Sequence, residues 1–378
     1  MAHKKIKVVV LYGGRSTEHD ISRKSAAFVL KNLDKEKYDI LAVGVDKAGR
    51  WIPQDINIIL EAAAEEIPID TVGRTLENAL PIHPTPGHML EISSGLEQTS
   101  EGAELVFFPI FHGTYGEDGA IQGLLTMANA AYVGSGIAGS AIGMDKCLAK
   151  KLVAAAGISV VPWLEARQQH FDNFTGEAFS NFTQKVEQKF SYPVFVKPAC
   201  LGSSVGITKA HNHEEFTEAC KLALSVDDKI LIEKAMDIRE IECAVLGDYD
   251  PDVSEPGEVI TSEDNFYSYE AKYLNADQAT IRVPADLPDK LKHEAKIICK
   301  KIFQELNLYG MARVDLFLEK QTNKFYFNEV NTIPGFTQIS QYPKLWQHAG
   351  KSASQLLDEL IKLALKRYKI ESKLNRSI

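Results

Sequence analysis

The sequence has few cysteines, and none of them form a pair at metal-ligand spacing. Among 378 residues the five cysteines are Cys147, Cys200, Cys220, Cys243 and Cys299, with no CxxC motif. An odd and dispersed set of this kind argues against a disulfide framework and against a zinc site. It predicts reduced thiols, as in a protein of the cytoplasm.

Long hydrophobic runs are also missing. The first residues, MAHKKIKVVVLYGG, are basic and then apolar, but only five apolar residues precede the glycines. That run is too short for the apolar core of a signal peptide and far too short to cross a bilayer. We therefore expect a first β-strand here, and no membrane partner.

Positive charge is not in excess. Lys and Arg number 42 against 51 for Asp and Glu, which leaves a net charge of -9. A nucleic-acid partner favours a concentrated basic surface, so this balance argues against one. Local lysines can still serve a single anionic ligand. The length allows two or three domains, each with a hydrophobic core.

The common nucleotide motifs are absent or weak. No GxxxxGK[ST] occurs, which excludes a Walker-type site. GSGIAG at 134–139 matches the dinucleotide pattern GxGxxG, but no acid follows about 20 residues later to bind a ribose. We expect a glycine-rich connection. A dehydrogenase remains an alternative that NADH binding would reveal.

Strand and helix patterns alternate in the first third of the chain. IKVVVLY, DILAVGVD and AELVFFPIF have strand character, and STEHDISRKSAAFVLKNL and GAIQGLLTMANA are helical. This βαβ order predicts an α/β class with a parallel sheet over roughly 1–125. Short strands and helices follow, and a polar, tyrosine-rich stretch occupies 261–280.

The segment FYFNEVN, 325–331, is an unusual strand. Simple alternation places Glu329 and Asn331 on the face that carries Phe325 and Phe327. RVDLFLE precedes it across the polar turn KQTNK, which predicts an antiparallel hairpin centred on Thr322. In that register Asp315 faces Glu329, and Arg313 faces Asn331.

Two directly opposed carboxylates repel each other, so this hairpin calls for a cation. Carboxylate and amide oxygens suit Mg²⁺ or Mn²⁺, which proteins often share with substrate phosphates. We therefore predict a metal site at Asp315, Glu329 and Asn331. The alternative is that both acids face solvent and Arg313 neutralises them.

A glycine-rich loop adds a second signal. VFVKPACLGSSVG carries Lys197 at the end of an apolar strand and then runs through Ser203 and Ser204. Backbone N–H groups of such a loop bind phosphates, and lysine adds charge. Alone, the loop is equally compatible with an ordinary flexible hairpin. Lys146 and the pair Glu233–Lys234 supply further charge at element ends. Together, these features predict phosphate chemistry.

Several separated motifs resemble one family. GGRSTEHDIS, HGTYGEDGAIQG, GSGIAGSAIGMDK, VKPACLGSSVGI, YSYEAKY, ARVDLF and NEVNTIPGFT occur in the order found in D-alanine–D-alanine ligases, members of the ATP-grasp superfamily. The resemblance covers nearly the whole chain. It implies a three-domain ATP-grasp fold: a Rossmann-like α/β domain at 1–125, a central subdomain with the glycine-rich loop at 126–225, and a C-terminal subdomain with metal site and lid at 226–378.

The resemblance also implies an activity. Such ligases join two D-alanines through a D-alanyl phosphate, with consumption of ATP, and supply peptidoglycan precursors. ATP and two ions of Mg²⁺ or Mn²⁺ are the implied cofactors. The implied form is a cytoplasmic homodimer with no nucleic-acid or membrane partner.

Site residues follow from the resemblance by position. Glu18 binds the ammonium of the first D-alanine, with His112 nearby. Arg313 faces the reacting carbonyl, and Ser340 holds the carboxylate of the second D-alanine. ATP contacts fall on Lys146, Lys197, Ser203, Ser204, Glu233, Lys234, Glu240 and Lys272. The metal ligands are Asp315, Glu329 and Asn331, and Tyr273 joins the catalytic set with Glu18, Ser203, Arg313 and Ser340.

Two departures and two rivals accompany this prediction. Cys200 and Leu201 stand where polar residues are usual, and Gln341 stands where a hydrophobic residue is commoner. A ligase for other amino or hydroxy acids is one rival, and Tyr273 argues against D-lactate as acceptor. The other is a regulatory ATP-binding module without turnover. Every charged position that the mechanism needs is present, which argues against that module.

Overall fold

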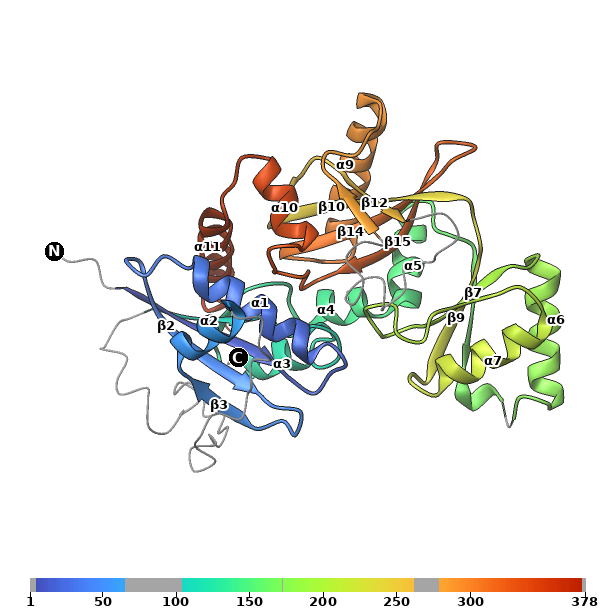
Figure 1. Ribbon diagram of the computed structural model, residues 1–378, viewed down its shortest axis with the longest axis horizontal. Coiled ribbons are helices and arrows are strands. Elements are labelled where there is room, and N and C mark those ends of the chain that lie inside the picture. The colour runs from blue at the N-terminus through green and yellow to red at the C-terminus, as the bar shows by residue number, and fades with distance from the viewer. Residues whose placement is uncertain (1–4, 65–103, 172, 262–278, 376–378) are drawn as a thin grey trace.

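The computed structural model describes residues 5–64, 104–171, 173–261 and 279–375, and three β-sheets follow one another along it (Figure 1). The predicted lid at 261–280, with Lys272 and Tyr273, falls almost entirely outside these residues. None of the helices in the described ranges combines the length and the apolar character needed to cross a membrane.

The first sheet has the strand order β3-β2-β1-β4-β5. β1, β2, β4 and β5 run parallel, as predicted, and β3 adds an antiparallel edge. The run Val8–Tyr12 is buried on both faces, as expected for a central parallel strand between helices. The elements are β1 (Ile6–Gly13), α1 (His19–Asn32), β2 (Tyr38–Val45), β3 (Trp51–Gln54), α2 (Ile56–Ala64), β4 (Leu105–Pro109), α3 (Ala120–Met127) and β5 (Ala131–Tyr132).

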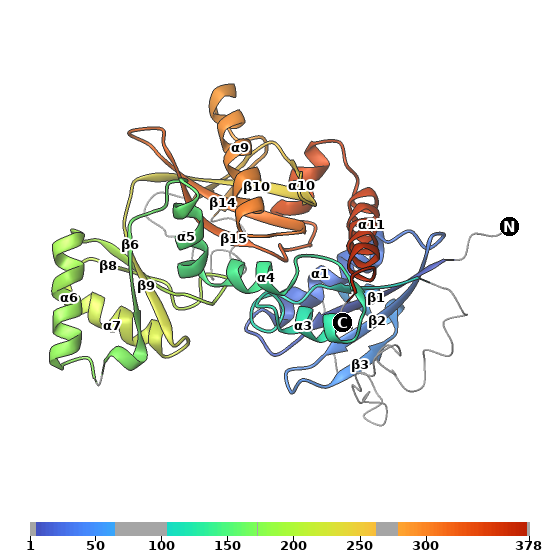
Figure 2. The same ribbon diagram turned by 180° about the vertical axis from the view of Figure 1, so that it is seen from behind.

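The second sheet is antiparallel, in the order β6-β9-β7-β8. Two helices cover one of its faces, and the whole unit stands apart at one end of the molecule (Figures 1 and 2). Two further helices lead into it from the first sheet. The elements are α4 (Ile137–Met144), α5 (Lys146–Ala155), β6 (Trp163–Arg167), a 3₁₀ turn (Gln168–His170), α6 (Glu177–Lys189), β7 (Val194–Pro198), β8 (Thr208–Ala210), α7 (His213–Leu224) and β9 (Lys229–Lys234).

The third sheet lies between the other two (Figure 1). Its order is β13-β12-β10-β14-β15, with β11 paired to β10. The helix α9 covers one face with Ala295, Cys299, Ile302 and Phe303, against apolar side chains of β10 and β14. The elements are β10 (Ile238–Gly247), β11 (Asp252–Val253), β12 (Gly257–Thr261), β13 (Ala279–Arg282), α9 (Asp289–Glu305), β14 (Gly310–Glu319) and β15 (Phe325–Asn331).

The chain then returns to the first sheet through α10 (Gln341–His348) and α11 (Ala353–Glu371). Leu357, Leu360 and Ile361 of α11 share one core with strands of the first sheet. Arg367 donates to the backbone carbonyls of Tyr132 and Gly134 at 2.8 and 2.7 Å. Its guanidinium also lies 4.2 Å from the ring centre of Tyr132. The last helix therefore fastens the third sheet to the first.

The predicted alternation along β15 is wrong, because the strand contains a β-bulge. Asp315 pairs with Glu329 as predicted, but Leu316 pairs with Phe327, which leaves Asn328 as an extra residue. The bulge reverses the faces beyond it. Val330 joins Phe327 in the core, and Glu329 turns to the opposite face. The acid therefore does not replace a core side chain.

Gly13 offers a test of the local geometry at the end of β1. Its φ is +90°, and a Cβ there would lie 2.3 Å from the carbonyl oxygen of Val45. We expect Gly13→Ala to lower the free energy of unfolding by about 2–4 kcal/mol, through left-handed strain and overpacking. Gly123 in α3 has open space around it, so Gly123→Ala should be stabilising by about 0.5–1 kcal/mol. Urea unfolding measures the free energy of unfolding of both variants. Equal values for the two would contradict the predicted strain at Gly13.

Candidate active site

Three carboxylates form a row across the third sheet. Glu242 on β10 is directly opposite Asp315 on β14, and Asp315 is directly opposite Glu329 on β15. Glu242 and Asp315 are both buried. Adjacent like charges of this kind raise the free energy of the folded state unless cations offset them.

Two cations lie against the row. The Arg313 guanidinium donates to both Asp315 oxygens at 2.7 and 2.6 Å and lies 2.9 Å from Glu242 Oε2. Although burial opposes the charged form, Asp315 and Glu242 hold the pKa of Arg313 well above its usual value. Lys146 Nζ lies 3.2 Å from Glu329 Oε2. Burial opposes its charge too, but Glu329 holds the pKa of Lys146 above its usual value. Both cations therefore stay charged.

The same row has the donor types of a magnesium site. Asp315 and Glu329 offer carboxylate oxygens at opposed positions, and Asn331 adds an amide whose Nδ2 donates to Asp315 Oδ2 at 3.0 Å. Within the described residues no cluster of three or more His, Cys, Asp or Glu side chains could hold a metal. Two acids and an amide, completed by phosphate oxygens and water, nevertheless match the way proteins bind Mg²⁺. The residues fit the metal.

A pocket opens over the row and reaches the glycine-rich loop between β7 and β8. Ser203 and Ser204 in that loop have φ values of +51° and +58°, a left-handed conformation that residues other than glycine rarely adopt. Such turns orient backbone N–H groups toward an anion. The lining includes Lys197, Ser204, Ile207, Glu240, Glu242, Arg313, Asp315, Phe317, Asn328 and Glu329.

A second, smaller pocket adjoins the first, because both include Glu329. It lies between the loop at 201–202, the helix start at Lys146 and the end of β15. Glu18 borders this region: its side chain accepts a hydrogen bond from Ser203. A Cβ at Gly202 would lie 2.8 Å from Glu18 Oε2, so a larger residue there would require the Glu18 carboxylate to move. The first sheet and the glycine-rich loop meet here.

Glu117 and His112 hold the backbone of Ile333, just beyond β15. Glu117 Oε1 accepts from the Ile333 N–H at 2.8 Å, and His112 Nδ1 lies 3.0 Å from the Ile333 carbonyl oxygen. Since a carbonyl only accepts, Nδ1 carries the proton, and Nε2 accepts from Ser25 Oγ at 2.8 Å. Burial lowers the pKa of His112 to about 4, so the ring is neutral.

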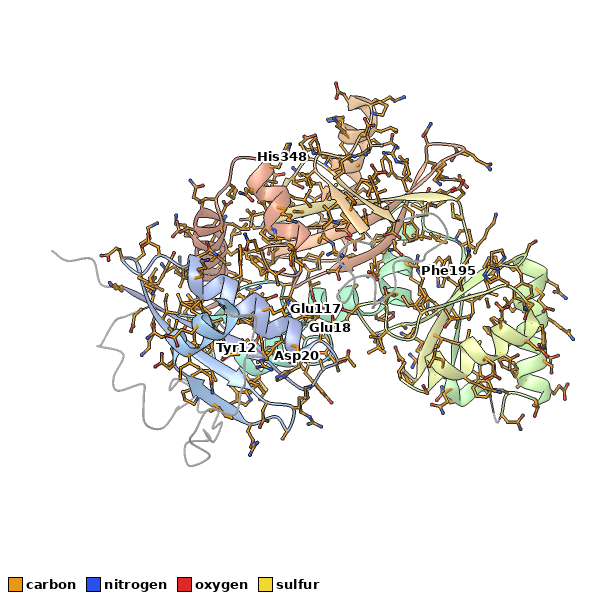
Figure 3. All side chains as sticks on the ribbon, in the orientation of Figure 1. Tyr12, Glu18, Asp20, Glu117, Phe195 and His348 are labelled. Atoms are coloured by element: carbon orange, nitrogen blue, oxygen red, sulfur yellow. The ribbon has the colours of Figure 1, made fainter. Side chains whose placement is uncertain are left out.

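Glu117 itself is a buried acid beside another acid. Burial first, and then the neighbouring Glu18, raise its pKa to about 8. Figure 3 shows Glu18 and Glu117 next to each other at the start of α1. At neutral pH the Glu117 carboxyl is therefore protonated, and it stabilises the loop as a hydrogen-bonding group without a charge.

Glu233 lies behind the first pocket. Its side chain is buried between two lysines, with Oε1 2.6 Å from Lys150 Nζ and Oε2 2.6 Å from Lys197 Nζ. Burial alone would raise the pKa of Glu233, but the two ammonium groups lower it to about 2. The carboxylate is fully ionised and faces the lysines.

Some predicted residues lie apart from these pockets. Lys234 is exposed on β9. Ser340 accepts from the Thr337 N–H at 2.9 Å and is not among the pocket-lining residues. His112 has both ring nitrogens engaged with Ser25 and Ile333. Lys272 and Tyr273 lie outside the described residues.

Family models match two long stretches of the chain. The description "D-ala D-ala ligase N-terminus" matches residues 7–135, and "D-ala D-ala ligase C-terminus" matches residues 152–362. The chain belongs to the D-alanine–D-alanine ligase family. Relatives named D-alanine–D-alanine ligase are similar over nearly their whole length. The protein of Caldicellulosiruptor bescii is 45% identical, with 96% of each chain covered, and that of Acetivibrio thermocellus is 42% identical, with 96% of this chain and 97% of the relative covered.

Solved structures of D-alanine–D-alanine ligases and related enzymes share the fold. The enzyme of Coxiella burnetii superposes with a TM-score of 0.80 at 36% identity, covering 98% of this chain and 96% of the other. The VanG D-Ala:D-Ser ligase of Enterococcus faecalis superposes with a TM-score of 0.80 at 31% sequence identity. The match covers 96% of this chain and 100% of the other. The predicted ATP-grasp fold is confirmed, and the dehydrogenase alternative is wrong.

Four residues in or next to the site of this D-alanine–D-alanine ligase family member were not predicted from the sequence. Glu242 follows Glu240 by two positions, which places both on one face of β10. Lys150 follows Lys146 by four, which places both on one face of α5. Glu117 lies inside the motif HGTYGEDG, where the glycines indicate only a turn. These three had a signal in their spacing or motif. Asn328 had none, because the bulge that exposes it is not visible in the alternation of the strand.

The protonated Glu117 makes stability depend on pH. Its pKa is about 8 in the folded protein against an ordinary 4.5, so the unfolded chain releases this proton first as pH rises. Stability should therefore fall between pH 4.5 and pH 8, by at most ~5 kcal/mol from this group. We expect Glu117→Gln to reduce that pH slope in urea unfolding at pH 5.5, 7 and 8.5.

The exposed Glu36 serves as control, and Glu36→Gln should keep the slope of the unmodified protein. Comparing slopes removes any constant loss that the amide substituted at position 117 causes. A Glu117→Gln slope equal to that of the unmodified protein would show that Glu117 is ionised in both states.

Proposed function

We propose that this protein joins two molecules of D-alanine to D-alanyl-D-alanine, with conversion of ATP to ADP and phosphate, and so supplies peptidoglycan precursors. The observation that carries the proposal is the arrangement of the two pockets around Glu329. One contains the acid row and Lys197, as ATP and metal require. The other contains Lys146 and Gly202 and borders Glu18, a carboxylate suited to an amino-acid ammonium.

The first step forms an acyl phosphate. One carboxylate oxygen of the first D-alanine attacks the γ-phosphorus, the bond from phosphorus to the bridging oxygen breaks, and ADP leaves. We assign Glu18 to the ammonium of this D-alanine. Lys146, Lys197 and the N–H groups around Ser203 and Ser204 hold the phosphates and offset their charge. Glu233, Lys234 and Glu240 are proposed around adenine and ribose, and Lys272 at the phosphates.

The second step forms the peptide bond. The neutral amine of the second D-alanine attacks the acyl carbon, and the tetrahedral oxyanion collapses. The bond from the acyl carbon to the phosphate oxygen breaks, and phosphate leaves with its electron pair and takes up the proton that the attacking nitrogen releases. Arg313 donates hydrogen bonds to the developing oxyanion, a contribution typically worth ~3 kcal/mol. We assign the carboxylate of the second D-alanine to Ser340. His112 and Tyr273 are proposed to border the first D-alanine.

Asp315, Glu329 and Asn331 would hold two ions of Mg²⁺ or Mn²⁺. When bound, these ions offset charge on the transferring phosphoryl group. In this structure Arg313 and Lys146 pair with the acids of the row, and the three carboxylates exceed these two cations by one negative charge.

We further propose three units along the chain, 1–125, 126–225 and 226–378. The three sheets support a division into three units, but neither border matches a sheet boundary. β5 (Ala131–Tyr132) pairs with β4 in the first sheet, and β9 pairs with β6 and β7 in the second. We therefore propose borders after Tyr132 and after Lys234. We also propose a cytoplasmic homodimer. The five free thiols support the cytoplasm. Light scattering after gel filtration tests the dimer, and a monomeric mass would refute it.

The acceptor is decided by a panel of amino acids. With ATP and D-alanine as the only amino acid, we expect ADP and D-alanyl-D-alanine in equal amounts. D-serine and D-lactate tested as second substrates should give less product at neutral pH. Coupled ADP release and chromatography of the products measure both. A preference for D-serine would make this chain functionally similar to the VanG enzyme, and ADP without dipeptide would refute ligation.

Glu329 tests the metal site. Glu329→Gln keeps the side-chain volume but removes a ligand charge, so we expect turnover to fall by roughly 100-fold or more, about 3 kcal/mol. Circular dichroism should show an unchanged fold. Glu319→Gln, at the far end of β14, is the matched control and should retain normal turnover. A folded Glu329→Gln protein with normal activity is incompatible with the proposed site.

A further inference from the structure

Lys150 is a fully buried lysine that the proposed reaction does not use. It lies on α5 one turn after Lys146, and its side chain is only 1% exposed. Its ammonium lies 2.6 Å from Glu233 Oε1 and donates to the Phe327 carbonyl oxygen at 3.4 Å. A buried ammonium is costly unless it is paired in this way. Its position therefore calls for a reason.

Glu233 connects this lysine to the nucleotide pocket. Its other oxygen, Oε2, lies 2.6 Å from Lys197 Nζ. Lys197 lines the first pocket beside Asn328, whose Oδ1 it approaches at 3.5 Å, whereas neither Glu233 nor Lys150 is among the lining residues. The three side chains form a line from the core to the pocket, in the order Lys150, Glu233, Lys197.

The line carries two positive charges and one negative charge. If the carboxylate faced Lys197 alone, the two would form a neutral pair, and the pocket would lose the lysine's attraction for phosphates. With Lys150 on its opposite oxygen, the carboxylate is already balanced, and one net positive charge remains. That charge is at the pocket end, because Lys197 is the member of the line that reaches it.

We propose that Lys150 is a positioning residue of the nucleotide site, one that balances Glu233 so that the charge of Lys197 stays available to the ATP phosphates. This inference rests on the proposed function, since it requires ATP in the first pocket. Lys150 acts through Glu233 and touches no substrate. A purely structural lysine would instead hold α5 to β9 and β15, with no effect on how the pocket discriminates phosphates.

The test compares nucleotides with different phosphate counts. Calorimetry gives the dissociation constants of ATP, ADP and AMP at constant free Mg²⁺ for the unmodified protein and for Lys150→Met, which keeps the length of the side chain. The readout is the ratio of the AMP constant to the ATP constant, because contacts with adenine and ribose cancel in it. We expect Lys150→Met to lower this ratio roughly tenfold, equivalent to ~1.4 kcal/mol, with ADP in between.

Two further variants sharpen the test. Lys151 is the next residue, half exposed and paired with Glu165 at 2.7 Å, so Lys151→Met should leave the ratio unchanged. The double variant Lys150→Met, Glu233→Gln removes both buried charges and frees Lys197, so its ratio should return to within about threefold of the original. Of the three buried charges only that of Lys197, at the pocket, then remains, so this variant is the second test if Lys150→Met does not fold.

The outcomes separate cleanly. An unmodified protein that binds no ATP overturns the proposed function. If it binds ATP, an unchanged ratio in Lys150→Met overturns the inference, as does equal weakening of ATP and AMP, which marks a structural residue. A double variant whose ratio stays tenfold low also overturns it.

Discussion

The row of Glu242, Asp315 and Glu329 is the constraint around which the site is organised. Direct pairing across three strands brings these carboxylates together on one face of one sheet. Such a row is unfavourable without positive charge close by. Arg313 comes from the same sheet, but Lys146 comes from α5, so the acids depend on packing against a helix from another part of the chain. The charges of the acid row are therefore offset only when α5 packs against the third sheet.

The helix α5 supplies a cation to each of two buried or half-buried acids. Its first turn presents Lys146 to Glu329, and its second turn buries Lys150 against Glu233. Asp145 caps this helix through the Cys147 and Leu148 N–H groups and pairs with Lys229 of β9. The helix is thus fixed between the second and third sheets. Small movements of α5 would change both charge pairs together.

The first sheet contributes through backbone contacts more than through charge. Glu117 accepts from the N–H of Ile333 and His112 donates to its carbonyl oxygen, and both side chains are uncharged. Ser25 extends this contact to the Phe336 N–H at 3.2 Å. Because both groups are uncharged, they order the segment after β15 without adding to the negative field of the acid row. The core shared by α11 and the first sheet holds the same junction from the other side.

The sequence alone determined the α/β class, the hairpin, its facing acids and the family, because strand periodicity, turn residues and motifs are local. It also identified most charged residues of the site. Only the tertiary structure decided which of these touch. The bulge at Asn328 reverses the faces of β15, and alternation cannot reveal it. Glu233 shares its carboxylate between Lys150 and Lys197, and Glu117 becomes neutral beside Glu18. Such pairings depend on burial and on distances between residues far apart in the chain. The spacing of residues along the sequence reveals neither.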